Sequence, residues 1–282
     1  GRNFVTKLWN IGRFLLQNIG DHTPPALANV DPESLLPADA WILSRLDAAI
    51  GECDAALGQA RPAADAWPVD ERNRGLRLDE YAESARRFAW NELADWYVEA
   101  VKTRLQSTDA DGDVARAVLV HVFDHALRLL HPIVPFITET LWQRLPGRVP
   151  GQFLATAAWP AVRGGTRDAA REFERLQEIV ASIRQVRGEY NVPPSQMTPA
   201  LLVGADDLAP TLERERALVT RLARSEITVA GAAPNVAAAH VLLRGGGEVI
   251  LPLAGIVDVA RERDRVEAEL AQLVKQLASL EG

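Results

Sequence analysis

Cysteine and methionine are scarce in this chain of 282 residues, which contains one of each, Cys53 and Met197. A single cysteine cannot form an internal disulfide or supply a zinc site by itself, which argues against redox and structural-zinc chemistry. The chain begins at Gly1 rather than at a methionine, so we expect it to start within a longer protein.

Long apolar runs are also lacking, although hydrophobic residues make up 48% of the chain and suffice for real cores. The run around Val118–Val122 is far shorter than the roughly 20 residues of a membrane span, and no signal sequence opens the chain. We therefore expect a cytoplasmic protein without a membrane partner. The net charge of −7 argues against indiscriminate nucleic-acid binding, but a local basic face remains compatible with it because phosphate attraction acts over short distances.

Recognisable catalytic motifs are lacking as well. The triplet Gly245–Gly247 is not followed by the helix and lysine of a phosphate-binding loop, so it predicts a turn. His121 and His125 are one helical turn apart, but no third metal ligand follows at a recognisable spacing, and we interpret them as packed helix residues. We therefore predict no catalytic residue, no metal and no cofactor in this chain.

The first half of the sequence has the periodicity of a helical bundle. Residues 2–19 place four apolar side chains in one stripe of a helix: Phe4, Leu8, Ile11 and Leu15. Gly20 is a natural end for this helix. Two further helices are predicted at 38–57 and 114–130. Another is predicted from a cap at Asp79 to about residue 105, and a shorter one after Pro135 to about residue 145. We predict a bundle over 1–146, a linker over 147–167 rich in Gly and Pro, and a surface insertion near 59–77.

The second half predicts a small α+β module over 168–254. A helix at 168–187 precedes four short strands, at 200–203, 226–229, 239–243 and 248–251, with another helix at 212–223. From Val259 to Leu280, residues at alternating spacings of four and three are apolar, with Arg263 the only polar member, which is typical of a coiled coil. We predict that 255–282 is the first arm of a truncated coiled coil, and the fold class is mainly α.

A basic face on the first predicted helix is the main candidate binding site. No acidic residue occurs before Asp21. The face gathers cations, amides and an aromatic side chain, beside Thr6 and Gln17: Arg2, Asn3, Lys7, Asn10, Arg13 and Phe14. Such groups can neutralise phosphates, read base edges and stack on unpaired bases. The alternative is a solvated face on which a neighbouring helix covers Phe14. Trp9 lies between this face and the apolar stripe, and we predict it to be a core residue.

Two further basic groups are weaker candidates. Arg184 and Arg187 lie on a helix in which neighbouring glutamates favour an ordinary salt-bridged surface. Arg261 and Arg265 lie on the heptad helix, where six acidic residues favour a solvated coiled-coil flank. We include all four as candidate RNA contacts and leave these alternatives open.

Four stretches, in this order, resemble the anticodon-binding bundle of class I aminoacyl-tRNA synthetases specific for branched aliphatic amino acids. They are GRNFVTKLWNIGRFLLQN, WILSRL, FAWNELADWYVEAVKTRL and LLHPIVPFITETLWQRL. Two later stretches favour the valyl-tRNA synthetase family, of the bacterial type: IRQVRGEYNVPP, and the segment from LPLAGIVDV to the end of the chain, which is similar to the start of its coiled-coil arm.

The resemblance implies a tRNA-binding region without catalysis of its own. The bundle is expected to bind the anticodon stem and loop of valine tRNA, and the arm to lean on the corner where the D and T loops meet. Aminoacylation would require ATP, magnesium, and catalytic and editing domains that this chain does not contain, in a monomeric full-length enzyme. The alternatives are the same region of an isoleucyl or leucyl enzyme, and a helical coiled-coil scaffold that binds a protein.

Overall fold

The computed structural model describes the chain except for residues 21–22, 59–75, 165–166, 255–266, 268–269 and 272–282. It is mainly α-helical, as predicted, with one four-stranded sheet. The chain divides into two compact units, Gly1–Phe173 and Glu174–Gly282. No helix among the described residues combines the length and the apolar character that crossing a membrane requires.

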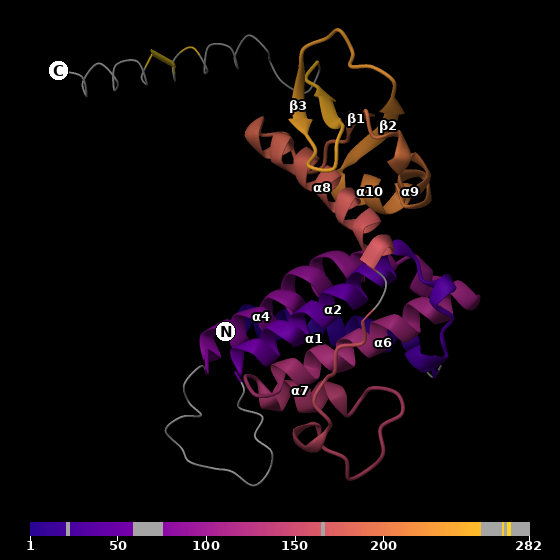
Figure 1. Cartoon of the computed structure of the whole chain (residues 1–282), viewed down its shortest axis with the longest axis vertical. Helices are drawn as coiled ribbons and strands as arrows, with labels where there is room; N and C mark the ends of the chain where they lie inside the picture. The colour runs from indigo at the N-terminus through magenta and orange to yellow at the C-terminus, as the bar shows by residue number, and fades with distance from the viewer. Residues whose placement is uncertain (21–22, 59–75, 165–166, 255–266, 268–269, 272–282) are drawn as a thin grey trace, which may run out of the picture. The chain divides into compact units, whose positions relative to one another are not determined.

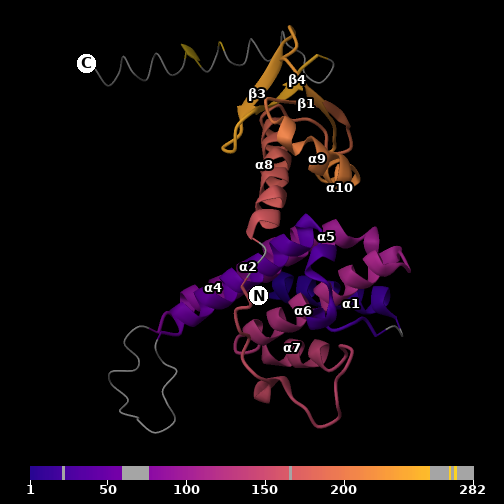
Figure 2. The same cartoon turned by 45° about the vertical axis from the view of Figure 1, so that its right-hand side comes forward.

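The first unit consists of helices packed around α6 (Figures 1 and 2). Its main helices are α1 (Arg2–Ile19), α2 (Pro37–Ala56), α4 (Leu78–Arg87), α5 (Val98–Val101), α6 (Ala110–Leu130) and α7 (Pro135–Trp142). Short 3-10 turns join them at Leu27–Asn29, Pro32–Ser34, Arg104–Gln106 and Leu154–Thr156. Most residues of α6 are buried, so this helix forms the centre of the core.

Helix α1 follows the sequence prediction closely. It spans Arg2–Ile19, and Gly20 adopts a positive φ of 57° directly after it. The predicted stripe faces the core, since Leu8, Ile11 and Leu15 are buried and Phe4 is half-buried. The prediction of this helix from its apolar spacing is therefore confirmed.

The third predicted helix differs from expectation in two ways. Asp79 lies in the first turn of α4 instead of capping it, because the helix begins at Leu78 and no side chain caps it. The helix then continues as a wider π-helical segment, Phe88–Tyr97, labelled η3. An apolar periodicity does not distinguish α from π winding over so short a stretch, and π segments often occur at functional sites.

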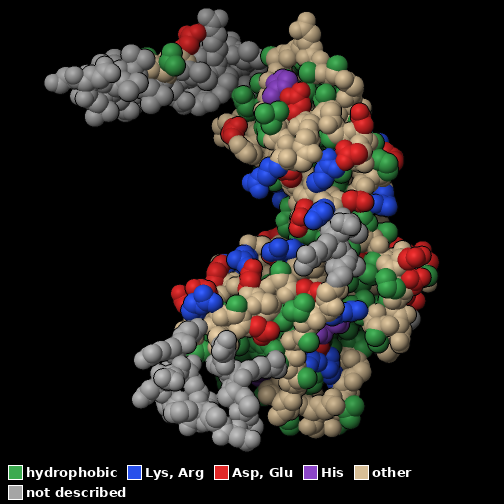
Figure 3. Space-filling view, viewed as in Figure 1, with side chains coloured by type: hydrophobic (Ala, Val, Ile, Leu, Met, Phe, Trp, Pro, Cys, Tyr) green, Lys and Arg blue, Asp and Glu red, His purple; other side chains and the backbone are tan. Residues whose placement is uncertain are grey.

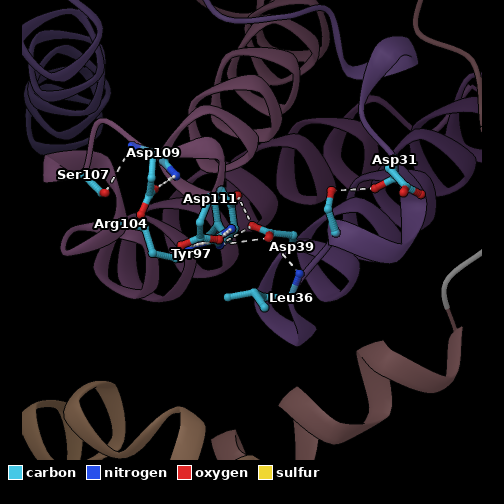
Figure 4. A network of polar contacts seen from close by, with 10 residues as sticks. Asp31, Leu36, Asp39, Tyr97, Arg104, Ser107, Asp109 and Asp111 are labelled. Carbon is cyan, nitrogen blue, oxygen red and sulfur yellow. Dashed lines mark hydrogen bonds and ion pairs between the residues drawn. The ribbon is translucent and has the colours of Figure 1, made fainter.

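The buried carboxylate of Asp39 in α2 is bonded to side chains from the π-helical segment and from the 3-10 turn Arg104–Gln106 (Figure 4). Asp39, in the first turn of α2, is fully buried and accepts hydrogen bonds from Tyr97 Oη at 2.7 Å and from Leu36 N at 3.0 Å. Arg104 Nη1 donates to both of its oxygens at 2.9 Å, and the same guanidinium contacts Asp111. Burial by itself would lower the pKa of Arg104, but Asp39 and Asp111 raise that pKa above its ordinary value, so the guanidinium is held charged.

The second unit combines a mixed sheet with helices on one of its sides (Figures 1 and 2). Its strands are β1 (Thr198–Val203), β2 (Ser225–Ala230), β3 (Ala238–Leu242) and β4 (Glu248–Pro252), in the order β2-β1-β4-β3. β1 pairs parallel to β2, and β4 pairs antiparallel to β1 and β3. The helices are α8 (Arg167–Glu189), which enters this unit at Glu174, α9 (Ala209–Arg214) and α10 (Arg216–Ala223). A 3-10 turn, Asp206–Leu208, precedes α9.

All four predicted strands are present, and the predicted Gly turn joins β3 to β4. Gly246 and Gly247 adopt φ values of 93° and 83°, which residues with a side chain rarely adopt. The helix predicted at 212–223 is in fact two helices, which meet at Glu215. Of the predicted coiled-coil arm, only Glu267, Leu270 and Ala271 are described, all in helical conformation. The rest of the heptad pattern, and residues 59–75 of the insertion predicted near 59–77, lie outside the described residues.

Candidate functional site

The outward face of α1 carries polar and cationic side chains, as the sequence indicates. Its exposed members are Arg2, Asn3, Thr6, Asn10, Arg13 and Gln17. Neither Arg2 nor Arg13 has an ion-pair partner among the residues that the structure describes, and α1 itself contains no carboxylate. Basic and acidic side chains are interspersed on the face drawn in Figure 3, which agrees with the negative net charge. The absence of acidic residues from α1 is therefore a local feature of an acidic chain.

Lys7 differs from the other cations on this helix because it is already engaged. Its Nζ lies 2.6 Å from Asp95 Oδ1 and 4.0 Å from the centroid of the Trp90 ring, which in turn stacks on Phe4. Trp90 and Asp95 are five residues apart on the π-helical segment, about one turn of such a helix, so both reach the same ammonium. No pattern in the sequence indicates this arrangement, which neutralises part of the positive charge of the face.

Phe14 is half-buried beside Lys102, whose Nζ lies 6.0 Å from the ring centroid. Lys102 is also paired with Glu99. The alternative of a covered Phe14 therefore holds in part, because the side chain is neither buried nor fully exposed.

Trp9 corrects the sequence prediction, because it is 41% exposed and does not belong to the core. The guanidinium carbon of Arg144, from the turn after α7, lies 5.8 Å from the centroid of the Trp9 ring. Arg144 is exposed, and its Nη1 also donates to the carbonyl of Thr140 at 2.8 Å. The position of Trp9 on the helix, at the border of the polar arc, was the only signal in the sequence that could have indicated its exposure.

Gly12, a buried residue of α1, determines how closely α7 approaches this helix. A Cβ at this position would lie 2.5 Å from Leu141 Cδ2 and 3.3 Å from Phe123 Cζ, so the absence of a side chain permits the contact. The outer residues of α7 consequently border the polar face of α1. The candidate surface thus extends over two helices, whereas the sequence indicated only one.

The basic residues predicted on α8 have different environments. Arg184 is exposed, and its Nε donates to the carbonyl of Leu222 at 2.9 Å. Arg187 is only 7% exposed, and its guanidinium donates to Thr198 Oγ1 and to the carbonyls of Arg224 and Pro193. The donors of Arg187 hold the start of β1 and the turn after α8, so its burial does not favour the predicted RNA contact.

The pKa of Arg187 is lowered mainly by burial and, to a smaller extent, by the positive charge of the nearby Arg224. Arg261 and Arg265, the remaining candidates, lie outside the described residues.

The two histidines of α6 are packed in the helix, as predicted. Their ring centroids are 4.0 Å apart, and His125 Nδ1 lies 2.8 Å from the carbonyl of His121. Burial, then the charges of His125 and Arg163, lowers the pKa of His121 to about 3. Over the described residues there is no group of three or more His, Cys, Asp or Glu side chains placed to hold a metal ion.

Comparison with known proteins identifies the family. Residues 69–202 match the family described as the anticodon-binding domain of tRNA ligases. The whole chain aligns with the valine–tRNA ligase of Prochlorococcus marinus at 39% identity over 292 residues, which is 30% of that relative. This chain belongs to the valine–tRNA ligase family.

Other valine–tRNA ligases match to a similar extent. The protein of Carboxydothermus hydrogenoformans is 36% identical, with 99% of this chain and 30% of that relative covered. The protein of Nocardia farcinica is 38% identical, with 100% and 29% covered. The chain therefore spans about 30% of the length of these valine–tRNA ligases. The isoleucyl, leucyl and scaffold alternatives are not favoured.

Proposed function

We propose that this chain recognises the anticodon stem-loop of valine tRNA and positions that tRNA for aminoacylation by the remainder of a valine–tRNA ligase. The observation that carries the proposal is the polar face of α1, a helix that contains no acidic residue, with Arg2 and Arg13 exposed, in a chain related to these enzymes throughout its length. Guanidinium groups bind phosphates, and the exposed amides of Asn3 and Asn10 are suited to reading base edges.

The role of this surface would be to convert binding energy into alignment. A tRNA held at its anticodon end presents its acceptor end in a restricted orientation, which favours the reaction without a contact at the reacting atoms. ATP and magnesium would act in the catalytic portion of the whole enzyme. Among the described residues, we assign none to that chemistry.

The finer organisation is part of the same proposal. It comprises an anticodon-binding bundle over 1–146, a linker over 147–167, an α+β module over 168–254 and a coiled-coil arm over 255–282. The arm, with Arg261 and Arg265, would contact the outer corner of the tRNA. The whole enzyme would act as a monomer in the cytoplasm.

A binding experiment tests the proposal. Fluorescence anisotropy over a salt series would compare valine tRNA, the same tRNA with an altered anticodon, and isoleucine tRNA. We expect valine tRNA to bind most tightly, and Arg13→Ala or Arg2→Ala to reduce the salt slope by about 1 for each phosphate that the variant no longer binds. Arg86→Ala is the matched control, since it removes an exposed arginine of α4 that pairs with Glu83. Equal binding of all three tRNAs, or slopes unchanged by the α1 substitutions, would refute the proposal.

A further inference from the structure

The outer side of α7 exposes an aromatic ring that the core does not use. Phe136 is 89% exposed, the highest value for any large hydrophobic side chain that the structure describes. Thr140 and Arg144 follow it at intervals of four residues, and both are exposed. The hydroxyl of Thr140 donates to the carbonyl of Phe136 at 2.7 Å, and Arg144 donates to the carbonyl of Thr140. This run is held by its own backbone and is open to a ligand.

Two contacts fix the direction of α7 along α1. Gly12 meets Leu141, and Trp9 meets Arg144, so earlier residues of α1 lie beside later residues of α7. The two helices are therefore antiparallel. Phe136 consequently lies toward the C-terminal half of α1, the half that bears Arg13, while the Trp9–Arg144 pair lies toward its N-terminal half.

The charges around this ring favour an anionic partner. Arg13 is an exposed cation in the half of α1 beside Phe136, and Arg144 is exposed eight residues after Phe136 in the turn that follows α7; neither has a carboxylate partner among the described residues. Glu139, the carboxylate of α7, is directed elsewhere, because it accepts hydrogen bonds from Gln143 and from Leu154 N. An exposed aromatic flanked by guanidinium groups without carboxylate partners matches a nucleotide, whose base stacks and whose phosphate is negative.

We propose that the outer side of α7 is a second RNA-contacting surface, on which Phe136 and the Trp9–Arg144 pair each stack against an unpaired base. This inference rests on the proposed function, since the strand would be the loop that α1 holds. Phe136 and Arg144 are eight residues apart, about 12 Å at a helical rise of 1.5 Å per residue. Neighbouring bases in a stacked strand are only about 3.4 Å apart. The surface therefore selects bases that are splayed apart, as in a loop, over bases in a duplex.

The test compares loop and duplex RNA on the same protein. The 282-residue chain would be titrated with the valine tRNA anticodon stem-loop, and with a duplex of equal length that lacks a loop. We expect Phe136→Ala to weaken stem-loop binding by roughly 5- to 100-fold, the range for removing one stacking aromatic, with little change in salt slope or duplex binding. Phe136→Tyr should retain binding because it keeps the ring.

A second readout separates stacking from general damage. Loop nucleotides would be replaced one at a time by 2-aminopurine, whose fluorescence reports stacking, and one position should lose its protein-induced change in Phe136→Ala. Phe153→Ala is the matched control, since Phe153 is an exposed ring outside α7. Equal thermal unfolding of the variants would establish that they are folded.

Three results would overturn the proposal, and they are distinguishable. Unaltered stem-loop binding and fluorescence in Phe136→Ala would remove α7 from the site while leaving the α1 proposal intact. Failure of the unsubstituted chain to bind the stem-loop would remove both. Self-association in sedimentation that Phe136→Ala abolishes would instead identify this ring as a contact between two copies of the chain.

Discussion

Lys7 Nζ lies 2.6 Å from Asp95 Oδ1, so the cation at the centre of the α1 face is balanced by a carboxylate of the π-helical segment. The side chain of Asp95 is 52% exposed and stands beside the proposed RNA site. A phosphate that approaches Lys7 must compete with this carboxylate and is repelled by it. At the proposed site, Asp95 would thereby limit nonspecific attraction to RNA.

Asp95→Asn is accordingly expected to strengthen RNA binding. The gain should be roughly two- to five-fold, typical of removing one partly exposed charge pair, and the salt slope should steepen by up to about 1. Anisotropy with valine tRNA measures both quantities. Glu83→Gln, which frees Arg86 on α4 in the same way, serves as the control and should change neither. Weaker binding of Asp95→Asn would mean that the carboxylate itself contacts the RNA.

The buried Asp39–Arg104 pair is expected to be essential for stability. Asp39→Ala leaves a guanidinium in the interior without its main partner, and should lower the free energy of unfolding by about 3–5 kcal/mol. Tyr97→Phe removes only one donor to the same carboxylate and should cost about 1 kcal/mol. Urea denaturation of the three proteins provides the measurement. Similar losses for both variants would show that the ion pair contributes no more than the hydroxyl.

Gly12→Ala tests the contact between α1 and α7. The added methyl group would overlap Leu141, and we expect a loss of roughly 1–3 kcal/mol together with weaker RNA binding, since the two outer surfaces would be displaced. Gly51→Ala is the matched control, because this exposed position in α2 has no atom within 4 Å of an added Cβ and should gain about 0.5–1 kcal/mol. Thermal and urea unfolding check the pair. A stabilised Gly12→Ala protein would contradict the assigned role of Gly12.

The depressed pKa of His121 predicts a loss of stability in acid. The native state holds this imidazole neutral down to about pH 3, whereas the unfolded chain takes up a proton near pH 6.5. The unfolded state therefore binds more protons between these values, and stability falls as the pH is lowered through that window. The contribution of His121 to the slope is at most about 1.4 kcal/mol per pH unit.

Replacing this imidazole should flatten the acid branch of the stability profile. His121 Nε2 is buried without a hydrogen-bond partner among the described residues, so His121→Leu should be tolerated at pH 7. Urea midpoints between pH 7 and pH 4 would be compared with those of the unsubstituted chain. Parallel pH profiles for the two proteins would show that His121 is protonated equally in both states.

Local periodicity predicted most of the fold. The apolar stripe that ends at Gly20 located α1, and the Gly245–Gly247 turn located the hairpin of β3 and β4. Features set by tertiary contacts were not predictable from it. The π-helical segment arises within an apolar pattern that fits α winding equally well, and a helical wheel cannot show which neighbours a border residue meets.

The candidate site shows the same limit. Its exposed cations on α1 were predictable because like residues recur on one arc of a single helix. The engagement of Lys7 by Asp95, the exposure of Trp9 and the burial of Arg187 each depend on a residue distant in sequence. A charge pattern in one element therefore identifies candidates but does not determine which of them remain available.

The missing side chain at Gly12 has a consequence for the energetics of recognition. With α1 and α7 in direct contact, their outer surfaces form one preorganised unit, and their spacing is set before any RNA arrives. Little conformational freedom would therefore be given up if RNA binds as proposed, so more of the interaction energy would appear as affinity. The flexible loop of the RNA, rather than the protein, would then bear most of the entropic cost of forming the complex.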